Sequence, residues 1–410
     1  MKFYFPDSQD LVSPTYDFMR DEYVAHRVRQ RDDRYAHEVL ESAPYHGILV
    51  SKSIVDGSIK GAGKYSAAQR ARIYRMGVRR FFRLPDAVET LGDNGAFNYV
   101  DEEVPPVTAE QTLDFYDECG FDAGISTDHI IFGYEPGAGE SDVDPQWAER
   151  RRLTLRLAEQ FINATRERRT SVRPVGAAQG WSPASFADSV HALQDMGYER
   201  IALGGMVPLR TAQILACLTQ IFDVLKPETE LHLLGITRLD SMDKFAALGV
   251  TSFDSTSAFR QAFMDDRNNY HTRERAYVAI RVPQVDGNPT LKRAILAGSV
   301  SQREAMSAER EALTALRSYD GSTASRVGCL DALGAYESVC QTKKSYLTAY
   351  DETLEAAPWT RCSCNLCQQH GVEIAIFRGT ERNKRRGFHN MSVLAQQMSG
   401  LKPTRGDADG

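Results

Sequence analysis

The chain has 410 residues, 42% hydrophobic and 25% charged, which is enough to bury a large core as one α/β barrel or as two ordinary domains. Its formal net charge of −6 argues against a generally basic coat for binding nucleic acids. The sequence has no run of 18 apolar residues, and its charged N-terminus has no long apolar run. We therefore expect a cytoplasmic protein with no signal peptide and no membrane contact.

Eight short apolar segments have the composition of β-strands, and amphipathic segments separate most of them. The predicted strands are residues 47–51, 79–84, 89–92, 124–131, 172–179, 200–204, 231–236 and 252–254. The predicted helices are residues 108–119, 146–169, 182–196, 209–225 and 241–248, with Ser182 as an N-cap before Pro183. Eight strands with helices between them predict an α/β fold, a (β/α)8 TIM barrel.

The pattern changes after the last predicted strand. We expect a TIM-barrel catalytic core with an N-terminal extension over residues 1–260, followed by a mostly helical insertion over residues 261–358. Residues 288–358 are helical by periodicity, with breaks at Gly298 and Gly321. A zinc-binding, basic segment completes the chain over residues 359–410.

This last segment is basic although the whole chain is acidic. Residues 361–410 contain 8 Lys/Arg and 4 Asp/Glu, which gives a local charge of +4. Such a patch could hold nucleic-acid phosphates, and a solvated charged face is the alternative. The candidate phosphate ligands are Arg382, Lys384, Arg385 and Arg386.

A cysteine-rich motif opens the same segment. Cys362, Cys364 and Cys367 form a C-x-C-x-x-C knuckle, and His389 follows 22 residues after the last of them. Three thiolates and one imidazole can complete a tetrahedral Zn²⁺ site, which would be structural because four protein ligands leave no open position. A disulfide, a redox pair and unrelated buried thiols are the alternatives, but C-x-C geometry strains a disulfide. His370 is the rival fourth ligand, although its short spacing favours His389.

Polar residues and glycines recur at the carboxyl ends of the predicted strands, where barrel enzymes place their working groups. They are Asp93, Asp128, Gln179, the run Gly204, Gly205 and Met206, and Asp254. Each one alone could be an ordinary turn residue. Together, a carboxylate pair suits chemistry at an anomeric carbon, while an amide, an acid and bare backbone N–H groups suit the edge of a purine.

These motifs resemble those of the tRNA-guanine transglycosylase family. Asp93-Asn-Gly-Ala-Phe-Asn resembles its D-S-G-G-F-Q loop, and Gln179-Gly180 resembles its Q-G strand end. Gly204-Gly205-Met206 resembles its G-G-L, and Phe253-Asp254-Ser255 resembles its F-D segment. The zinc motif is the most specific part of the match, which covers about residues 45–260 and 360–400.

The resemblance implies a role for each matched residue. Asp254 would be the nucleophile that attacks C1′ of the nucleoside, and Asp93 the general acid and base. Asp128 would accept hydrogen bonds from N1–H and the 2-amino group of guanine. Gln179 and the backbone N–H of Gly205, beside Gly204, would donate to O6. Met206 would line the pocket.

Departures from the family pattern favour a DNA substrate. Asn94 and Ala96 replace the usual Ser and second Gly, the bacterial L-P-T-R signature is absent, and 108 residues separate Asp254 from Cys362. The chain is most similar to the DNA-acting 7-deazaguanine transglycosylase branch, the DpdA type. That branch exchanges guanine for a 7-deazaguanine base such as 7-cyano-7-deazaguanine (preQ0), and a protein partner for access to DNA is compatible with it. A tRNA substrate and a non-catalytic nucleic-acid-binding subunit are the alternatives.

Overall fold

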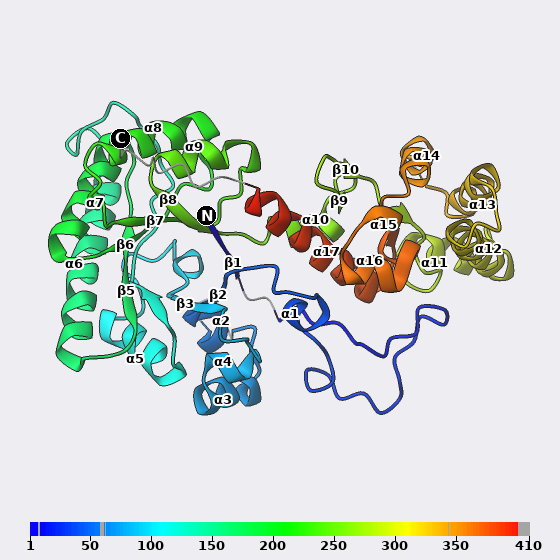
Figure 1. The fold of residues 1–410 in the computed structure, drawn as a ribbon, viewed down its shortest axis with the longest axis horizontal. Coiled ribbons are helices and arrows are strands. Elements are labelled where there is room, and N and C mark those ends of the chain that lie inside the picture. Colours follow the sequence, from blue (N-terminus) through cyan, green and yellow to red (C-terminus); the bar gives the residue numbers. More distant parts are fainter. Residues whose placement is uncertain (7–8, 58–60, 62, 343, 401–410) are drawn as a thin grey trace, which may run out of the picture. The chain divides into compact units, whose positions relative to one another are not determined.

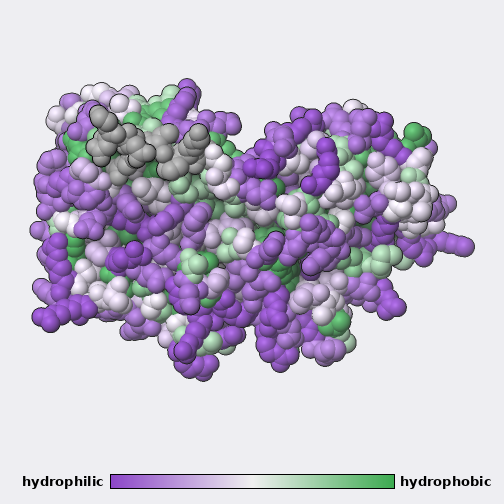
Figure 2. Space-filling view, viewed as in Figure 1, coloured by the Kyte–Doolittle hydropathy of each residue, from purple (hydrophilic) through white to green (hydrophobic). Residues whose placement is uncertain are grey.

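The computed structural model describes residues 1–6, 9–57, 61, 63–342 and 344–400. They form two compact units. The first consists of Tyr45–Thr256 with the two ends of the chain, and the second consists of Gln9–Pro44 with Ser257–Gln397. The face of the protein in Figure 2 is largely hydrophilic, with apolar residues in small groups. Within the described part of the chain, every helix is too short or too polar to cross a membrane.

The first unit is a closed barrel of eight parallel strands (Figure 1). The strands are β1 (Lys2–Pro6), β2 (Gly47–Ser51), β3 (Glu89–Asp93), β4 (Ala123–Ile125), β5 (Arg173–Ala178), β6 (Arg200–Leu203), β7 (Glu230–Leu233) and β8 (Val250–Asp254). The barrel closes where β1 pairs with β8, with Tyr4 in register with Asp254. Its interior is a packed core that includes Leu49, Leu91, Ile125 and Val175. The predicted TIM barrel is thereby confirmed.

Helices separate the strands. They are α2 (Lys52–Asp56), α3 (Ala67–Met76), α4 (Val78–Phe81), α5 (Ala109–Cys119), α6 (Pro145–Arg168), α7 (Pro183–Met196), α8 (Thr211–Phe222) and α9 (Met242–Ala247). Two 3₁₀ turns, η1 (Ala96–Asn98) and η2 (Leu239–Ser241), lie in the loops. Ser182 is the N-cap of α7, as predicted, because its side chain accepts a hydrogen bond from the backbone N–H of Ser185.

The strand predicted over residues 124–131 ends at Ile125. Two further parts of the predicted set of strands were wrong. Residues 79–84 form the end of α4 and a turn, not a strand. The guanidinium of Arg79 donates to the carbonyls of Pro85 and Val88 and to Asp122, so it stabilises the turn before β3. The eighth strand is β1, which the sequence analysis read only as a charged N-terminus. The barrel needs it because β1 joins β2 to β8.

The second unit is mainly helical. Its helices are α1 (Ala36–Val39), α10 (Ser257–Met264), α11 (Pro289–Leu296), α12 (Gln302–Asp320), α13 (Arg326–Val339), α14 (Leu347–Ala356), α15 (Pro358–Arg361), α16 (Asn365–His370), the 3₁₀ turn η3 (Gly371–Ile374) and α17 (Gly379–Ser399). Short strands form two small sheets: β9 (Tyr270–His271) with β10 (Ala276–Tyr277), and β11 (Ile280–Arg281) with β12 (Ile376–Phe377). The breaks near Gly298 and Gly321 lie where they were predicted.

The division into units differs from the expected domains in two ways. Residues 9–44, expected to extend the barrel, belong to the second unit, where Asp21 forms ion pairs with Arg378 and Arg382. The helical and metal-binding segments also form one unit through residue 397 rather than two. Sequence periodicity identifies helices but not the long-range ion pairs that join these segments. The end of the expected C-terminal segment, residues 401–410, lies outside the described residues.

Candidate active site and metal centre

The strand order brings the candidate catalytic residues to one end of the barrel. Asp93 is the last residue of β3 and Asp254 the last of β8, while Asp128 and Gln179 follow β4 and β5. Because all eight strands are parallel, these positions share the carboxyl-terminal rim. Asp128 and Asp254 each lie close enough to Asp93 for their charges to raise its pKa.

Asp128 is held by two side-chain amides. The Nδ2 of Asn94 donates to Oδ1 at 2.9 Å, and the Nε2 of Gln179 donates to Oδ2 at 2.6 Å. The carboxylate is 3% exposed, and burial raises its pKa although both amide hydrogen bonds oppose the rise. The acid is therefore fixed in orientation by donors that leave each oxygen able to accept a further hydrogen bond.

Gln179 has a single orientation, and two glycines make room for it. Its Oε1 accepts from the backbone N–H of Ile131 at 3.3 Å, which leaves Nε2 as the donor to Asp128. A Cβ atom on Gly204 would collide with Nε2, and one on Gly205 would meet Oε1 and the carbonyl of Ile131. Gly205 also has a φ of +73°, which favours glycine. The next residue, Met206, is fully buried.

A buried histidine holds Asp254. The Nε2 of His232 lies 3.2 Å from Oδ1 of Asp254, and the backbone N–H of Gly235 donates to the same oxygen at 3.0 Å. Burial lowers the pKa of His232, so the ring is neutral near pH 7. Since an ionised carboxylate only accepts, Nε2 carries the proton and Nδ1 accepts from the hydroxyl of Ser252, 2.9 Å away.

Asp93 has the most perturbed acidity of the three carboxyl groups. Burial, followed by the charge of Asp128 and then that of Asp254, raises its pKa from 3.8 to about 7, against opposing hydrogen bonds from the backbone of Gly95 and from Ser51. Its side chain is nevertheless half-buried and so reaches solvent at the rim. A group that is half protonated near neutral pH can both give and take a proton.

Sequence reasoning missed three residues that support the site. His232 lies between two buried leucines of β7, and strand alternation together with its pairing opposite Ser252 could have placed it near Asp254. Asn94 was noted only as a departure from the family pattern. The hydroxyl of Tyr99 contacts Oδ1 of Asn94 and, at 3.1 Å, the carbonyl of Asp128, which is a contact without a sequence signal.

Two exposed aromatic rings lie in the loops that follow Asp93 and Asp128. Phe97 is 59% exposed and Phe132 is 41% exposed, and their ring centroids are 5.7 Å apart. Large exposed apolar side chains at a polar rim are typical of a binding surface. They extend the candidate site beyond the residues predicted for it.

The predicted metal ligands come together in the second unit. The ligand atoms of Cys362, Cys364, Cys367 and His389 all lie within 4.8 Å of one another. The Nδ1 of His389 is 3.6, 3.4 and 3.4 Å from the three sulfurs in turn. Tetrahedral Zn²⁺ with ordinary bond lengths requires a sulfur–nitrogen separation of roughly 3.5 Å. The cluster can therefore hold a metal ion, and its donors fit zinc.

Surrounding contacts orient the histidine for this role. The Nε2 of His389 donates to the carbonyl of His271 at 2.8 Å, which leaves Nδ1 facing the sulfurs. The rival ligand His370 instead lies against the ring of Phe18, with centroids 5.0 Å apart. His389 is thus the fourth member of the cluster.

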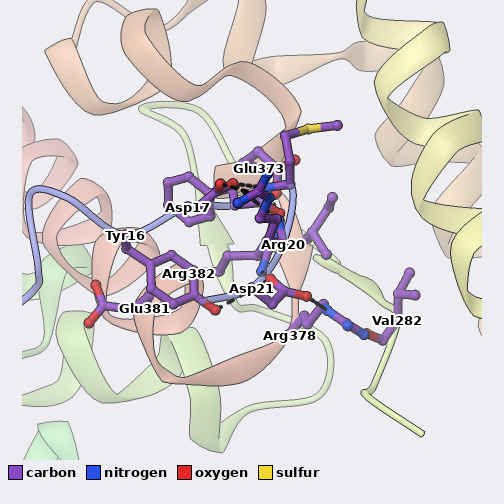
Figure 3. Close-up of polar contacts among 12 residues, drawn as sticks. Tyr16, Asp17, Arg20, Asp21, Val282, Glu373, Arg378, Glu381 and Arg382 are labelled. Atoms are coloured by element: carbon purple, nitrogen blue, oxygen red, sulfur yellow. Dashed lines mark hydrogen bonds and ion pairs between the residues drawn. The ribbon is translucent and has the colours of Figure 1, made fainter. Parts of the chain in front are cut away.

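The predicted phosphate ligands do not fit their positions in the structure. Arg382, Arg385 and Arg386 are 1%, 3% and 0% exposed, respectively. Arg382 points toward Asp21 and Glu373 in Figure 3, and pairs with both of them. These guanidinium groups therefore pair with acids or donate to carbonyls inside the second unit, and their burial keeps them from reaching a nucleic acid.

The other predicted phosphate ligands also have partners inside the second unit. Arg385 pairs with Glu381, and Lys384 lies 3.1 Å from Asp10. Arg386 donates to backbone carbonyls, among them that of Ala262, and burial lowers its pKa to about 9. The basic run was misread because sequence alone does not show which charges the helix α17 buries.

A closed parallel barrel with carboxylates from several strands at its carboxyl-terminal rim defines the class of TIM-barrel enzymes. No family model matches the chain. The chain is 48% identical over 404 residues to a protein of Salmonella montevideo named DNA-guanine transglycosylase. The aligned region covers 97% of this chain and 96% of that protein. The chain therefore belongs to the guanine transglycosylase superfamily.

Proposed function

We propose that this protein exchanges guanine in DNA for a 7-deazaguanine base such as preQ0, through a covalent aspartyl intermediate. The observation that carries the proposal is the placement of Asp254 and Asp93 at the same rim as the Asp128–Gln179 pair. One pair of groups suits chemistry at C1′, and the other suits the polar edge of guanine. The name of the Salmonella relative supports DNA as the substrate.

Guanine recognition would use the donors and acceptors that the pair leaves free. Asp128 can accept from N1–H and the 2-amino group, because the amides of Asn94 and Gln179 occupy one site on each oxygen. The second N–H of Gln179 and the backbone N–H of Gly205 would donate to O6. Adenine presents the opposite polarity at these positions, so it would leave buried groups unpaired.

Asp254 would be the nucleophile. Its hydrogen bonds within the described chain both end on Oδ1, from His232 and Gly235, so Oδ2 is the oxygen available for attack. Attack by Oδ2 forms a bond to C1′ while the bond from C1′ to N9 breaks, and the bonding pair leaves with the purine. His232 keeps the carboxylate aligned and spreads its charge without taking a proton.

Asp93 would carry the protons. In its protonated form it gives a proton to the departing guanine, which neutralises the electron pair of the broken bond. The resulting carboxylate then takes the N9 proton of the incoming base, whose nitrogen attacks C1′ and releases Asp254. A pKa of about 7 supports both roles at neutral pH.

A base in duplex DNA must leave its stack to reach such a rim, which costs a few kcal/mol. The exposed rings of Phe97 and Phe132 supply an apolar surface on which a displaced or neighbouring base can stack. A deoxyribose has no 2′-hydroxyl, so the site needs no hydrogen-bonding partner for one.

Zn²⁺ bound by Cys362, Cys364, Cys367 and His389 would stabilise the second unit, since all four coordination positions come from the protein.

Mass spectrometry of nucleosides from DNA and tRNA, in cells with and without this chain, tests the proposal. A 7-deazaguanine deoxynucleoside should appear in DNA only when the chain is present. Modified tRNA with unmodified DNA would favour the tRNA alternative. No change in either pool, even with the purified chain and preQ0, would favour a non-catalytic nucleic-acid-binding subunit.

A further inference from the structure

The metal centre fixes a β-hairpin in the second unit. Strands β9 and β10 form this hairpin, whose turn is Thr272–Arg275. His389 donates to the carbonyl of His271, and the side chain of Asn390 accepts from its backbone N–H at 3.0 Å. The hydroxyl of Tyr270 lies 3.1 Å from the sulfur of Cys367. A metal ligand and its neighbour on α17 thus determine where the hairpin lies.

The turn of this hairpin forms one wall of a cavity of about 490 Å³. Arg273 and Arg275 come from the turn, and Arg361 comes from the residue just before the first metal ligand. The lining also contains Glu274 and two of the metal-ligating residues, Cys362 and His389, so the three arginines line a cavity beside the metal centre with one acidic residue among them. We call this space the arginine cavity.

The three arginines differ in how far they are already engaged. Arg275 pairs with Glu352 at 3.0 Å and lies over the ring of Tyr277. Arg361 donates one hydrogen bond to the carbonyl of Ala356, at 2.9 Å. Arg273 is exposed, and its backbone carbonyl accepts from Gln397. Arg273 and Arg361 therefore retain donors for a ligand, while Arg275 mainly supports the wall.

We propose that the arginine cavity binds a backbone phosphate of the DNA substrate. A planar guanidinium presents paired donors that match phosphate oxygens. Two of them, Arg273 on the hairpin turn and Arg361 at the end of α15, favour an anion of that shape. The cationic contact for DNA would therefore lie in the arginine cavity rather than at the buried residues of α17. This inference rests on the proposed function, because it takes DNA as the substrate.

The proposal also gives the metal centre a second consequence. Metal binding fixes His389, and His389 holds the hairpin that carries Arg273. Loss of the metal should therefore weaken DNA binding even where the barrel remains folded. The phosphate contact would be independent of sequence, because a phosphate carries no base identity.

The experiment measures binding of a fluorescein-labelled guanine-containing DNA duplex by anisotropy, over a series of salt concentrations. The test variant is Arg273→Ala/Arg361→Ala. The matched control is Arg303→Ala/Arg310→Ala, which removes two exposed arginines from α12 in the same unit. Zinc content and thermal melting of all proteins should match those of the wild type, since the four side chains are exposed. Glu274→Gln removes a negative charge from the arginine cavity, so it should change DNA binding in the opposite direction.

The test pair should lose roughly tenfold in affinity at 0.1 M salt, and its salt slope should fall by about 0.9 for each phosphate that the variant no longer neutralises. The control pair should bind as the wild type does, and Glu274→Gln should bind roughly twofold more tightly by the same charge argument. Equal losses in the two pairs, or an unchanged salt slope in the test pair, would overturn the proposal. Guanine exchange by the wild type is measured separately, so a cavity that fails to bind DNA is distinguishable from an enzyme that does not act on it.

Discussion

The imidazole of His232 lies 3.2 Å from Oδ1 of Asp254, inside the barrel and shielded from solvent. A neutral histidine that donates to one oxygen of a carboxylate fixes its plane and leaves the other oxygen for attack. The pair was invisible as a motif, because 22 residues separate its members. It gives the proposed nucleophile a defined orientation before substrate binds.

His232→Phe should therefore slow covalent-adduct formation roughly 10- to 100-fold, the effect of losing a hydrogen bond to a charged group worth about 1.5–3 kcal/mol. The DNA concentration at half-maximal rate should change little, because His232 does not face the substrate base. His232→Gln can still donate to Asp254 and should recover part of the rate. Single-turnover kinetics measures the rate of adduct formation. A variant that changes only the DNA concentration at half-maximal rate, and not the rate itself, would contradict the orienting role.

Asp93 should link stability to pH. Its pKa is raised in the folded protein, from 3.8 to about 7, so the folded state binds the proton more tightly than the unfolded chain does. The resulting stabilisation is complete below pH 4 and is lost as the pH rises to about 7. Asp93→Asn imitates the protonated acid, so its Tm should exceed that of the wild type at pH 8 and match it at pH 4. Melting curves that differ equally at both pH values would contradict this linkage.

Arg382 should matter for stability. Removing it leaves Asp21 and Glu373 short of a partner inside the second unit, and breaking a buried ion pair costs about 3–5 kcal/mol. Arg382→Ala should therefore unfold at clearly lower denaturant concentration, whereas Arg303→Ala, on the surface of α12, should change stability by less than about 0.5 kcal/mol. Urea titration with a probe in the second unit distinguishes them. A fully stable Arg382→Ala protein with weakened DNA binding would restore the phosphate role.

The metal cluster predicts about one Zn²⁺ per chain, by analogy with other three-cysteine, one-histidine sites. Elemental analysis of purified protein measures this number. Cys364→Ser should yield insoluble or loosely folded protein, because structural zinc contributes directly to the free energy of folding. Cys340→Ser removes a buried thiol outside the cluster and is the control for loss of a sulfur. Active protein without zinc would contradict the assignment.

The barrel and its rim were predictable because they follow from local patterns. Strand periodicity and the residues at strand ends identified seven of the eight positions around the barrel, and Asp93, Asp128, Gln179 and Asp254 meet at its rim. The missing strand, β1, begins at the second residue of the chain. Its pairing with β8 depends on the closed barrel rather than on its own sequence.

The charge assignments were not predictable in the same way. Arg382 and Arg386 occur in a run that reads as a basic surface, yet α17 turns both of them inward. Arg382 pairs with Asp21 and Arg386 donates to the carbonyl of Ala262, both far away in the sequence, so neither composition nor helical spacing reveals these contacts. The arginine cavity was missed for the matching reason, because its walls come from a hairpin and from a helix end that lie far apart in the chain.

Trapping of the covalent intermediate tests the central claim most directly. The enzyme is mixed with labelled guanine-containing DNA and a 7-deazaguanine base, then denatured and separated by electrophoresis. A labelled band that survives denaturation should form with the wild type and slowly with Asp93→Asn, which keeps the attacking carboxylate. It should be absent from Asp254→Ala, which should still bind DNA. Retained exchange activity in Asp254→Ala would contradict the account and would move the nucleophile to Asp93 or Asp128.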